Sequence, residues 1–446
     1  MMPDLIIRNA SIVNTNEIQK ADIAIENGQI VEIDESIASS SKEEINATGL
    51  HIFPGLIDVH VHFNEPGRKE WEGIQTGSSA LAAGGGTLYL DMPLNSDPPL
   101  LTAKDFLAKK QVAEVSSHTD FAFWGGLTPD NLEHLPELAE LGIIGFKAFM
   151  SNSGIKEFKA VDDLSLYTGM QIAATLNLPV AVHAESEPLT SALTQQIHQQ
   201  GRKGIQDYLE SRPVIAELEA INRALFFAEK TGCDLHIVHV SSAKGIDSIT
   251  QAKHRGLRVT CETCPHYLYF TQDDLEALGA VAKCAPPLRS NQERLALWQK
   301  VLQGDVDLIA SDHSPSSAEL KESADFFAVW GGISGVQSTL QVLLSNPDLS
   351  LSDVVRLTAA NPARRFKLAN KGKLERGYDA DFTLIDLTQT HILQKEDLFY
   401  RHQQSPYVGK TFRGIIKQTL LGGKTIVKEG TIISQPSGKF IQPKPA

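Results

Sequence analysis

Residues 53–67 read FPGLIDVHVHFNEPG and place His60 and His62 two positions apart at the end of an apolar run. In an extended strand, residues i and i+2 project from the same face, so both imidazoles can reach one point in space. The apolar residues before the pair favour a buried strand, and the Asn-Glu-Pro-Gly sequence after it favours a loop. The pair is therefore predicted at the carboxyl end of a strand, in a geometry suited to a metal ion.

Further apolar segments in the middle of the chain end in loops in the same way. They are GTLYLDMP (86–93), DFAFWGG (120–126), IIGFKAFM (143–150), LPVAVHAE (178–185), DLHIVHVSS (234–242), LRVTCETCPH (257–266) and VDLIASDHSP (306–315). Amphipathic segments separate them, such as 214–232, where Gly232 is suited to end a helix. With the strand at 56–60 they make eight βα units, which predicts an α/β fold with a (β/α)8 TIM barrel.

The two chain ends have a different texture from the centre. Short segments alternate apolar and polar residues before residue 53, and the pattern returns near 379–387 and beyond. This pattern is typical of a small antiparallel sheet. We expect residues 1–52 and 376–446 to form one small β-sandwich domain, and residues 53–375 to form the barrel.

Composition excludes several classes of function. The chain has 446 residues, 42% of them hydrophobic, and a formal charge of −13 without a Lys/Arg block, so neither nucleic acid nor an anionic membrane is an expected partner. The N-terminal sequence has no basic region followed by a long apolar segment, which favours a cytoplasmic protein. Four cysteines are too few for a disulfide scaffold at this length. Cys261 and Cys264 form a single CxxC, which we interpret as buried packing residues.

The ends of the predicted strands carry an unusual set of side chains. They are His60, His62, Lys147, His183, His239 and Asp312. Neutral imidazole and carboxylate suit zinc and similar divalent ions. A lysine buried beside metal ions should have a lowered pKa, and its neutral amine can then react with carbon dioxide to form an anionic carbamate. The two carbamate oxygens could bridge two metals.

The motifs HVH, GFKAF, VHAE, HVSS and SDHSP, in this order, resemble the cyclic amidase branch of the amidohydrolase superfamily, which contains dihydroorotases, hydantoinases and allantoinases. The resemblance implies one metal held by His60, His62 and Asp312, a second held by His183 and His239, and a carboxylated Lys147 between them. It also implies two divalent ions, zinc above all with cobalt or manganese as alternatives, and a homotetramer. Asp312 would accept a proton from the attacking water and pass it to the leaving nitrogen.

Within this branch, the local sequence favours a neutral small-molecule substrate. Dihydroorotases typically place an arginine two residues after the second histidine to bind the substrate carboxylate, and this chain has Asn64 there. The stretches EPGRKEWEG (65–73) and YRHQQSPYVGKTF (400–412) resemble allantoinases. The expected reaction is hydrolysis of (S)-allantoin to allantoate in purine breakdown.

Four residues are candidates for substrate contact: Asn64, Asn95, Cys284 and Gly332. His266 and His313 flank the rim and are expected to support it. The alternatives are a dihydroorotase, a hydantoinase or dihydropyrimidinase, and a non-catalytic scaffold relative, because fold alone does not fix function.

Overall fold

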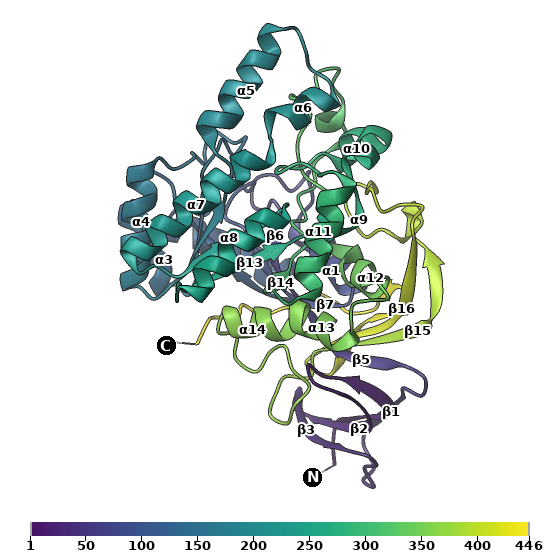
Figure 1. The fold of residues 1–446 in the computed structure, drawn as a ribbon. Helices are drawn as coiled ribbons and strands as arrows, with labels where there is room; N and C mark the ends of the chain where they lie inside the picture. Colours follow the sequence, from purple (N-terminus) through teal and green to yellow (C-terminus); the bar gives the residue numbers. More distant parts are fainter. Residues whose placement is uncertain (1, 445–446) are drawn as a thin grey trace.

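The computed structural model describes residues 2–444, and its centre is a closed barrel of eight parallel strands (Figure 1). The strands are β6 (Leu56–Val61), β7 (Gly86–Asp91), β8 (Asp120–Phe123) with its short continuation β9 (Gly125–Gly126), β10 (Phe146–Phe149), β11 (Val180–His183), β12 (Leu235–Ile237), β13 (Val259–Thr263) and β14 (Leu308–Ile309). A bridge between Val61 and His313 joins the first strand to the last, and the His62 amide donates to the His313 carbonyl at 2.8 Å. The predicted fold class is confirmed.

The barrel interior is filled by apolar side chains. Leu88 on β7, Ala181 on β11 and Leu308 on β14 belong to one buried cluster, although these strands are not neighbours in the sheet. Such contacts are possible only across the inside of a closed barrel, which is packed rather than hollow. The polar strand ends therefore lie on top of a solid apolar floor.

Helices surround the strands. They are α1 (Ile74–Ala83), α2 (Ala103–Ser116), α3 (Leu135–Glu140), α4 (Asp163–Thr175), α5 (Glu187–Gln199), α6 (Ile205–Ser211), α7 (Val214–Thr231), α8 (Ala243–His254), α9 (Pro265–Tyr269), α10 (Gln272–Leu278), α11 (Asn291–Leu302), α12 (Thr339–Leu344), α13 (Leu351–Val355) and α14 (Asn361–Arg365). Gly232 ends α7 in the left-handed conformation, with φ 69°, as predicted for a glycine at a helix end.

Both chain ends contribute to a separate nine-stranded sheet, which lies at the lower right of Figure 1. Its strands are β1 (Leu5–Val13), β2 (Ile18–Glu26), β3 (Gln29–Asp34), β4 (Glu43–Asn46), β5 (His51–Pro54), β15 (Phe382–Ile392), β16 (Thr411–Leu421), β17 (Lys424–Lys428) and β18 (Thr431–Ile432). Antiparallel pairing of β5 with β15 joins the N-terminal strands to the C-terminal ones.

The pairing of this sheet differs in one respect from the antiparallel prediction. Strand β1 pairs in parallel with both β4 and β5. In its pairing with β2, strand β1 is irregular between Ile7 and Ala10, where Asn9 has φ 59°. Such a bulge changes the direction of the strand, so its two halves meet different neighbours.

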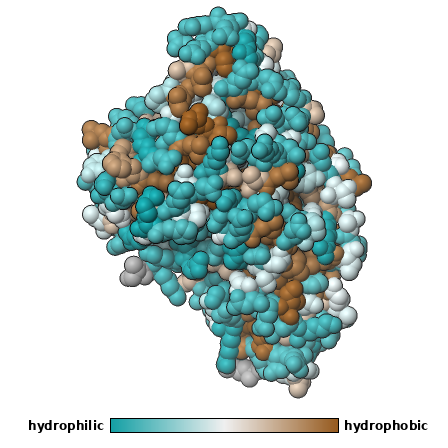
Figure 2. Space-filling model, in the orientation of Figure 1, coloured by the Kyte–Doolittle hydropathy of each residue, from teal (hydrophilic) through white to brown (hydrophobic). Residues whose placement is uncertain are grey.

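The CxxC cysteines are buried packing residues, as the sequence predicts. All four cysteines are free and buried, and Cys261 and Cys264 belong to the main apolar cluster. On the face drawn in Figure 2, small groups of apolar side chains lie scattered among hydrophilic ones. Across residues 2–444, no helix combines the length and the apolar character that crossing a bilayer requires.

Candidate metal centre

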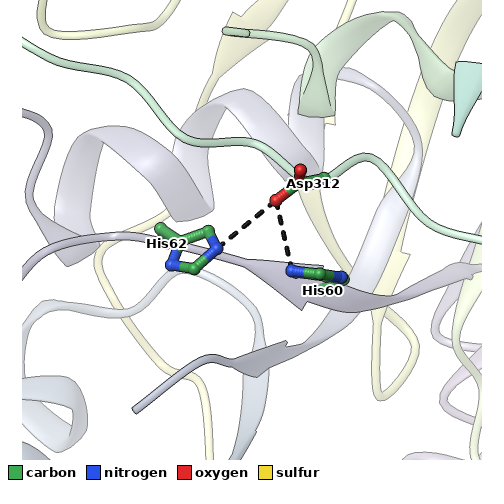
Figure 3. A group of neighbouring side chains, drawn as sticks. All are labelled: His60, His62 and Asp312. Atoms are coloured by element: carbon green, nitrogen blue, oxygen red, sulfur yellow. Dashed lines mark ion pairs between the residues drawn. The ribbon is translucent and has the colours of Figure 1, made fainter. Parts of the chain in front are cut away.

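His60, His62 and Asp312 meet at the carboxyl ends of the first and last barrel strands (Figure 3). Oδ1 of Asp312 lies 3.1 Å from Nε2 of His60 and 3.3 Å from Nε2 of His62. One potential ligand atom from each residue lies within 4.8 Å of the others. Two imidazole nitrogens and a carboxylate oxygen converging in this way form a donor set that suits a divalent transition metal.

His183 and His239 form a second group beside the first. Nδ1 of His183 lies 3.0 Å from Nε2 of His239, and the rings of His239 and His60 have centroids 5.5 Å apart. Burial lowers the pKa of both His183 and His239, and for His183 it outweighs the opposite effect of Glu185. Both rings are therefore held as neutral imidazoles, the form that binds metal.

Lys147 on β10 is fully buried, and Nζ has no hydrogen-bond partner in the described part of the chain. Burial lowers the pKa of this amine to about 8, and the charge of Lys147 in turn contributes to the lowered pKa of His60, His183 and His239. A buried amine without a partner is costly. The orphaned nitrogen beside both histidine groups fits a lysine that is modified to a carbamate and bound to metal.

Buried carboxylates fix the orientation of two of the histidines. Oε1 of Glu262 lies 2.5 Å from Nδ1 of His60, which leaves Nε2 of His60 directed at Asp312. Oε2 of Glu185 lies 2.9 Å from Nε2 of His183, which leaves Nδ1 directed at His239. Carboxylate partners of this kind set the tautomer and raise the basicity of a ligating imidazole.

Sequence reasoning missed these two carboxylates. Glu185 follows His183 by two residues at the same strand end, and this spacing could have indicated a contact. Glu262 lies between Cys261 and Cys264, and its partner His60 is 202 residues away, so no local pattern pointed to it. Arg212, which forms an ion pair with Glu185, was also missed.

The backbone at the site is held in uncommon conformations. His239 has φ 39°, Asp312 has φ 46°, Asn64 has φ 65° and Asn95 has φ 69°, all in the left-handed region. Non-glycine residues occupy this region at an energetic cost, which the surrounding structure must offset. Asp58 contributes to this support, because its Oδ1 accepts from the amides of His60, at 3.2 Å, and Ser311, at 3.1 Å.

Three of the four predicted substrate contacts gather around residues 314–315. The Asn64 amide donates to the Pro315 carbonyl at 3.3 Å, and the Asn95 amide donates to Oγ of Ser314 at 3.4 Å. A Cβ atom added at Gly332 would lie 2.1 Å from the Ser314 carbonyl oxygen. The carbonyl oxygen of Cys284, the fourth candidate, accepts a hydrogen bond from the Tyr208 hydroxyl at 2.8 Å.

His313 lies directly after Asp312, and its carbonyl accepts from the His62 amide at 2.8 Å. Its Nδ1 accepts from the Gly335 amide at 3.2 Å, so its Nε2 carries the proton and faces Oε2 of Glu72 at 3.4 Å. His266 is buried, and its Nε2 has no hydrogen-bond partner among the described residues. Neither histidine joins the group formed by His60, His62 and Asp312.

The architecture and these side chains define an α/β barrel with a candidate metal centre at its strand ends, and comparison with known proteins gives its family. The family model described as "Amidohydrolase family" matches residues 51–426. The chain therefore belongs to the amidohydrolase family.

Individual relatives match over essentially the whole chain. An allantoinase of Solibacter usitatus is 52% identical, with 99% of this chain and 98% of the relative covered. An allantoinase of Deinococcus radiodurans is 49% identical, with both chains fully covered. Among solved structures, the L-hydantoinase of Arthrobacter aurescens is 33% identical and superposes with a TM-score of 0.96, covering 99% of this chain and 100% of its own.

Proposed function

We propose that this enzyme is an allantoinase, which adds water across a ring amide of allantoin to give allantoate. The observation that carries the proposal is full-length similarity to curated allantoinases at 39–52% identity. The chemistry of the strand ends supports hydrolysis of a cyclic amide, and Asn64 supports a neutral ring.

The metal ligands in this proposal are His60, His62, Lys147, His183, His239 and Asp312. The imidazoles, the carboxylate and the orphaned amine of Lys147 fit two divalent ions, zinc above all, joined by a lysine carbamate. Bound there, the ions would polarise the substrate carbonyl and lower the pKa of a water molecule to near neutrality.

Asp312 is the proposed proton carrier. Its interactions with His60 and His62 outweigh the effect of burial, so its pKa lies well below the usual value and it remains a carboxylate at neutral pH. When the water oxygen bonds to the ring carbonyl carbon, the carboxylate takes the proton. The ring C–N bond then breaks, and the same proton passes to the leaving nitrogen.

The surroundings of Asn64 and Asn95 favour a neutral ring over dihydroorotate. The Oδ1 atom of Asn64 is buried without a partner among the described residues, so it can accept a hydrogen bond from a ring or ureido N–H. Arg68 lies beside Asn95 but donates to the carbonyls of Asn95 and Ser96, both at 3.3 Å, and pairs with Glu157 at 3.5 Å. Its charge is thus already partnered, and a substrate carboxylate would meet no free arginine there.

The two stretches that resemble allantoinases contact each other at the rim. The Arg401 amide donates to Oε1 of Glu72 at 3.0 Å, and Nε2 of His402 lies 2.7 Å from the Glu70 carbonyl oxygen. The Gln404 side chain donates to the Ser316 carbonyl at 3.0 Å. The 400–412 stretch therefore links the 65–73 loop to the segment that follows Asp312, which supports a shared role in substrate choice.

A substrate panel tests the proposal. Metal-loaded protein is incubated with allantoin, dihydroorotate, dihydrouracil and hydantoin, and ring opening is followed for each. We expect the highest kcat/KM on allantoin. A dominant rate on dihydroorotate or on hydantoin would replace the proposal with the corresponding alternative. We also propose that the enzyme is a homotetramer, which sedimentation of the purified protein tests, and that it is cytoplasmic, which fractionation of cells tests.

A further inference from the structure

Two lysine side chains are surrounded by the main chain of one loop, the 326–332 segment. Nζ of Lys283 donates to the carbonyl oxygens of Phe326 at 2.6 Å, Phe327 at 3.2 Å and Val329 at 2.5 Å. Nζ of Lys321 donates to the carbonyl oxygens of Trp330 at 2.9 Å and Gly332 at 2.7 Å. The two amines together bind five carbonyl groups of this short segment.

Neither amine has a carboxylate partner. Among the ion pairs within 4.0 Å in residues 2–444, none involves Lys283 or Lys321. Lys283 is 3% exposed, and its Nζ lies 4.6 Å from the ring centroid of Tyr208 and 5.2 Å from that of Phe326. Burial lowers the pKa of both amines to about 7. The three carbonyl acceptors around Nζ of Lys283 match the three donors of the protonated amine, and the aromatic faces favour the same form. The conformation of the segment and the charge of the lysines depend on each other.

The segment is connected to the candidate substrate contacts. The Gly332 amide donates to the Lys283 carbonyl at 2.7 Å, and the Ser314 amide donates to the carbonyl of Ile333 at 3.0 Å. Gly332 has φ 148° and approaches the Ser314 carbonyl so closely that no Cβ fits. Ser314 in turn accepts from Asn95.

The 326–332 segment also contacts the loop that follows the first barrel strand. The ring of Trp330 meets the ring of Trp71 edge to face, with centroids 4.7 Å apart. Trp71 lies in the 65–73 loop, which begins directly after Asn64. The 326–332 segment therefore contacts both the strand-eight side and the strand-one side of the site.

We infer that Lys283 and Lys321 are positioning residues for substrate binding: their ammonium groups hold the main chain of the 326–332 segment in the shape that presents Gly332 beside Ser314 to the cyclic amide. The inference rests on the proposed function for the identity of that substrate. Neither lysine touches the predicted metal ligands, so their contribution is to binding and not to the chemical step.

The test uses Lys283→Met and Lys321→Met, which keep the side chain as far as Cε and remove the charged nitrogen. Lys321→Arg is the conservative variant, since this partly buried side chain has more room than Lys283. Lys253→Met is the control for losing a bound lysine elsewhere, because Lys253, on α8 outside the site, donates to the Asp305 carbonyl at 3.2 Å and pairs with Asp307 at 2.6 Å. Steady-state kinetics on allantoin, metal content and hydrogen exchange of the 326–335 amides are measured for each.

We expect both methionine variants to raise KM about tenfold, because each loses a set of charge-assisted hydrogen bonds. The value of kcat should change less than about threefold. Hydrogen exchange should accelerate at the amides of 326–335 and stay unchanged at those of 56–63, and Lys321→Arg should restore KM.

Unchanged KM and unchanged hydrogen exchange in folded, metal-loaded variants would overturn the inference, and so would an equal effect of Lys253→Met. If Lys283→Met does not fold, Lys321→Met decides. Should wild-type protein not hydrolyse allantoin, the proposed function fails, while hydrogen exchange still decides the role of the lysines.

Discussion

Glu262 holds His60 in place from the side opposite the candidate metal centre. Its Oε1 lies 2.5 Å from Nδ1 of His60, and its Oε2 lies 3.1 Å from Nε2 of His236. Burial alone would raise the pKa of Glu262, but the charges and hydrogen bonds of His60 and His236 lower it to about 2. At neutral pH the glutamate is therefore a carboxylate that keeps the proton of His60 on Nδ1 and leaves Nε2 free to bind a metal.

Replacing Glu262 by glutamine should weaken metal binding without removing a ligand. The neutral amide no longer stabilises a proton on Nδ1 of His60, and loss of such partners typically costs 10- to 100-fold, so we expect a drop of about that size in metal affinity. Competition with a chelator measures it. Glu219→Gln on the outer face of α7 serves as the control. Wild-type metal affinity in Glu262→Gln would contradict this role.

Lys147→Ala should abolish metal binding and hydrolysis together. The alanine side chain provides neither the amine nor a carbamate, so the two metal sites lose the group proposed to join them. Addition of a short carboxylic acid, which offers two oxygens in the same space, should restore part of both. Metal analysis and allantoin hydrolysis measured with and without the acid check this. Full activity of the variant in the absence of acid would rule out the bridge.

Asn64→Ala should raise KM about tenfold and leave metal content unchanged, because the variant loses a polar contact to the ring but no ligand. Alanine also accommodates φ 65° less well than asparagine, at a cost of about 1 kcal/mol. Asn9→Ala is a matched control, since Asn9 has φ 59° but lies in the terminal sheet. Both variants should lose similar stability in urea unfolding. If both also had the same KM, Asn64 would have only a structural role.

Lys371 is a buried charged residue that joins the barrel to the terminal sheet. Its Nζ lies 2.6 Å from Asp120, 2.7 Å from Asp381 and 3.0 Å from Asp379, and the lysine side chain is 5% exposed. Removing one partner from a buried cluster leaves uncompensated charge, so Lys371→Met should cost about 3–5 kcal/mol in the free energy of unfolding.

The neighbouring Lys373 provides the comparison for this prediction. It pairs with Glu375 at the surface, so Lys373→Met should cost about 0–1 kcal/mol. Burial alone would lower the pKa of Lys371, but the three aspartates raise it above its ordinary value. The stabilisation is therefore complete at neutral pH and is lost only as the pH rises through the raised value. Equal unfolding free energies for the two variants would contradict this account.

The sequence was sufficient for features that follow from local periodicity. The spacing of His60 and His62 fixed their common direction, and His183, His239 and Asp312 could be placed because each follows a recognisable apolar strand. The carboxylates behind the ligands could not be placed in this way, because Glu262 meets His60 only once the barrel closes. The same holds for Lys283, whose acceptors are main-chain carbonyls that carry no sequence signal. The change of partner along β1, from β4 to β5, coincides with a bulge at Asn9, which alternation of side chains does not reveal.

The most direct test of the account is a metal titration of the apo-protein. Zinc is added in bicarbonate buffer, and bound metal and allantoin hydrolysis are measured on the same samples. The account predicts that two equivalents of zinc bind per chain and that hydrolysis rises as the two sites fill. The ligands would be His60, His62, Lys147, His183, His239 and Asp312. Rapid allantoin hydrolysis by protein that binds no metal, or saturation with two equivalents and no hydrolysis of allantoin, would contradict the account.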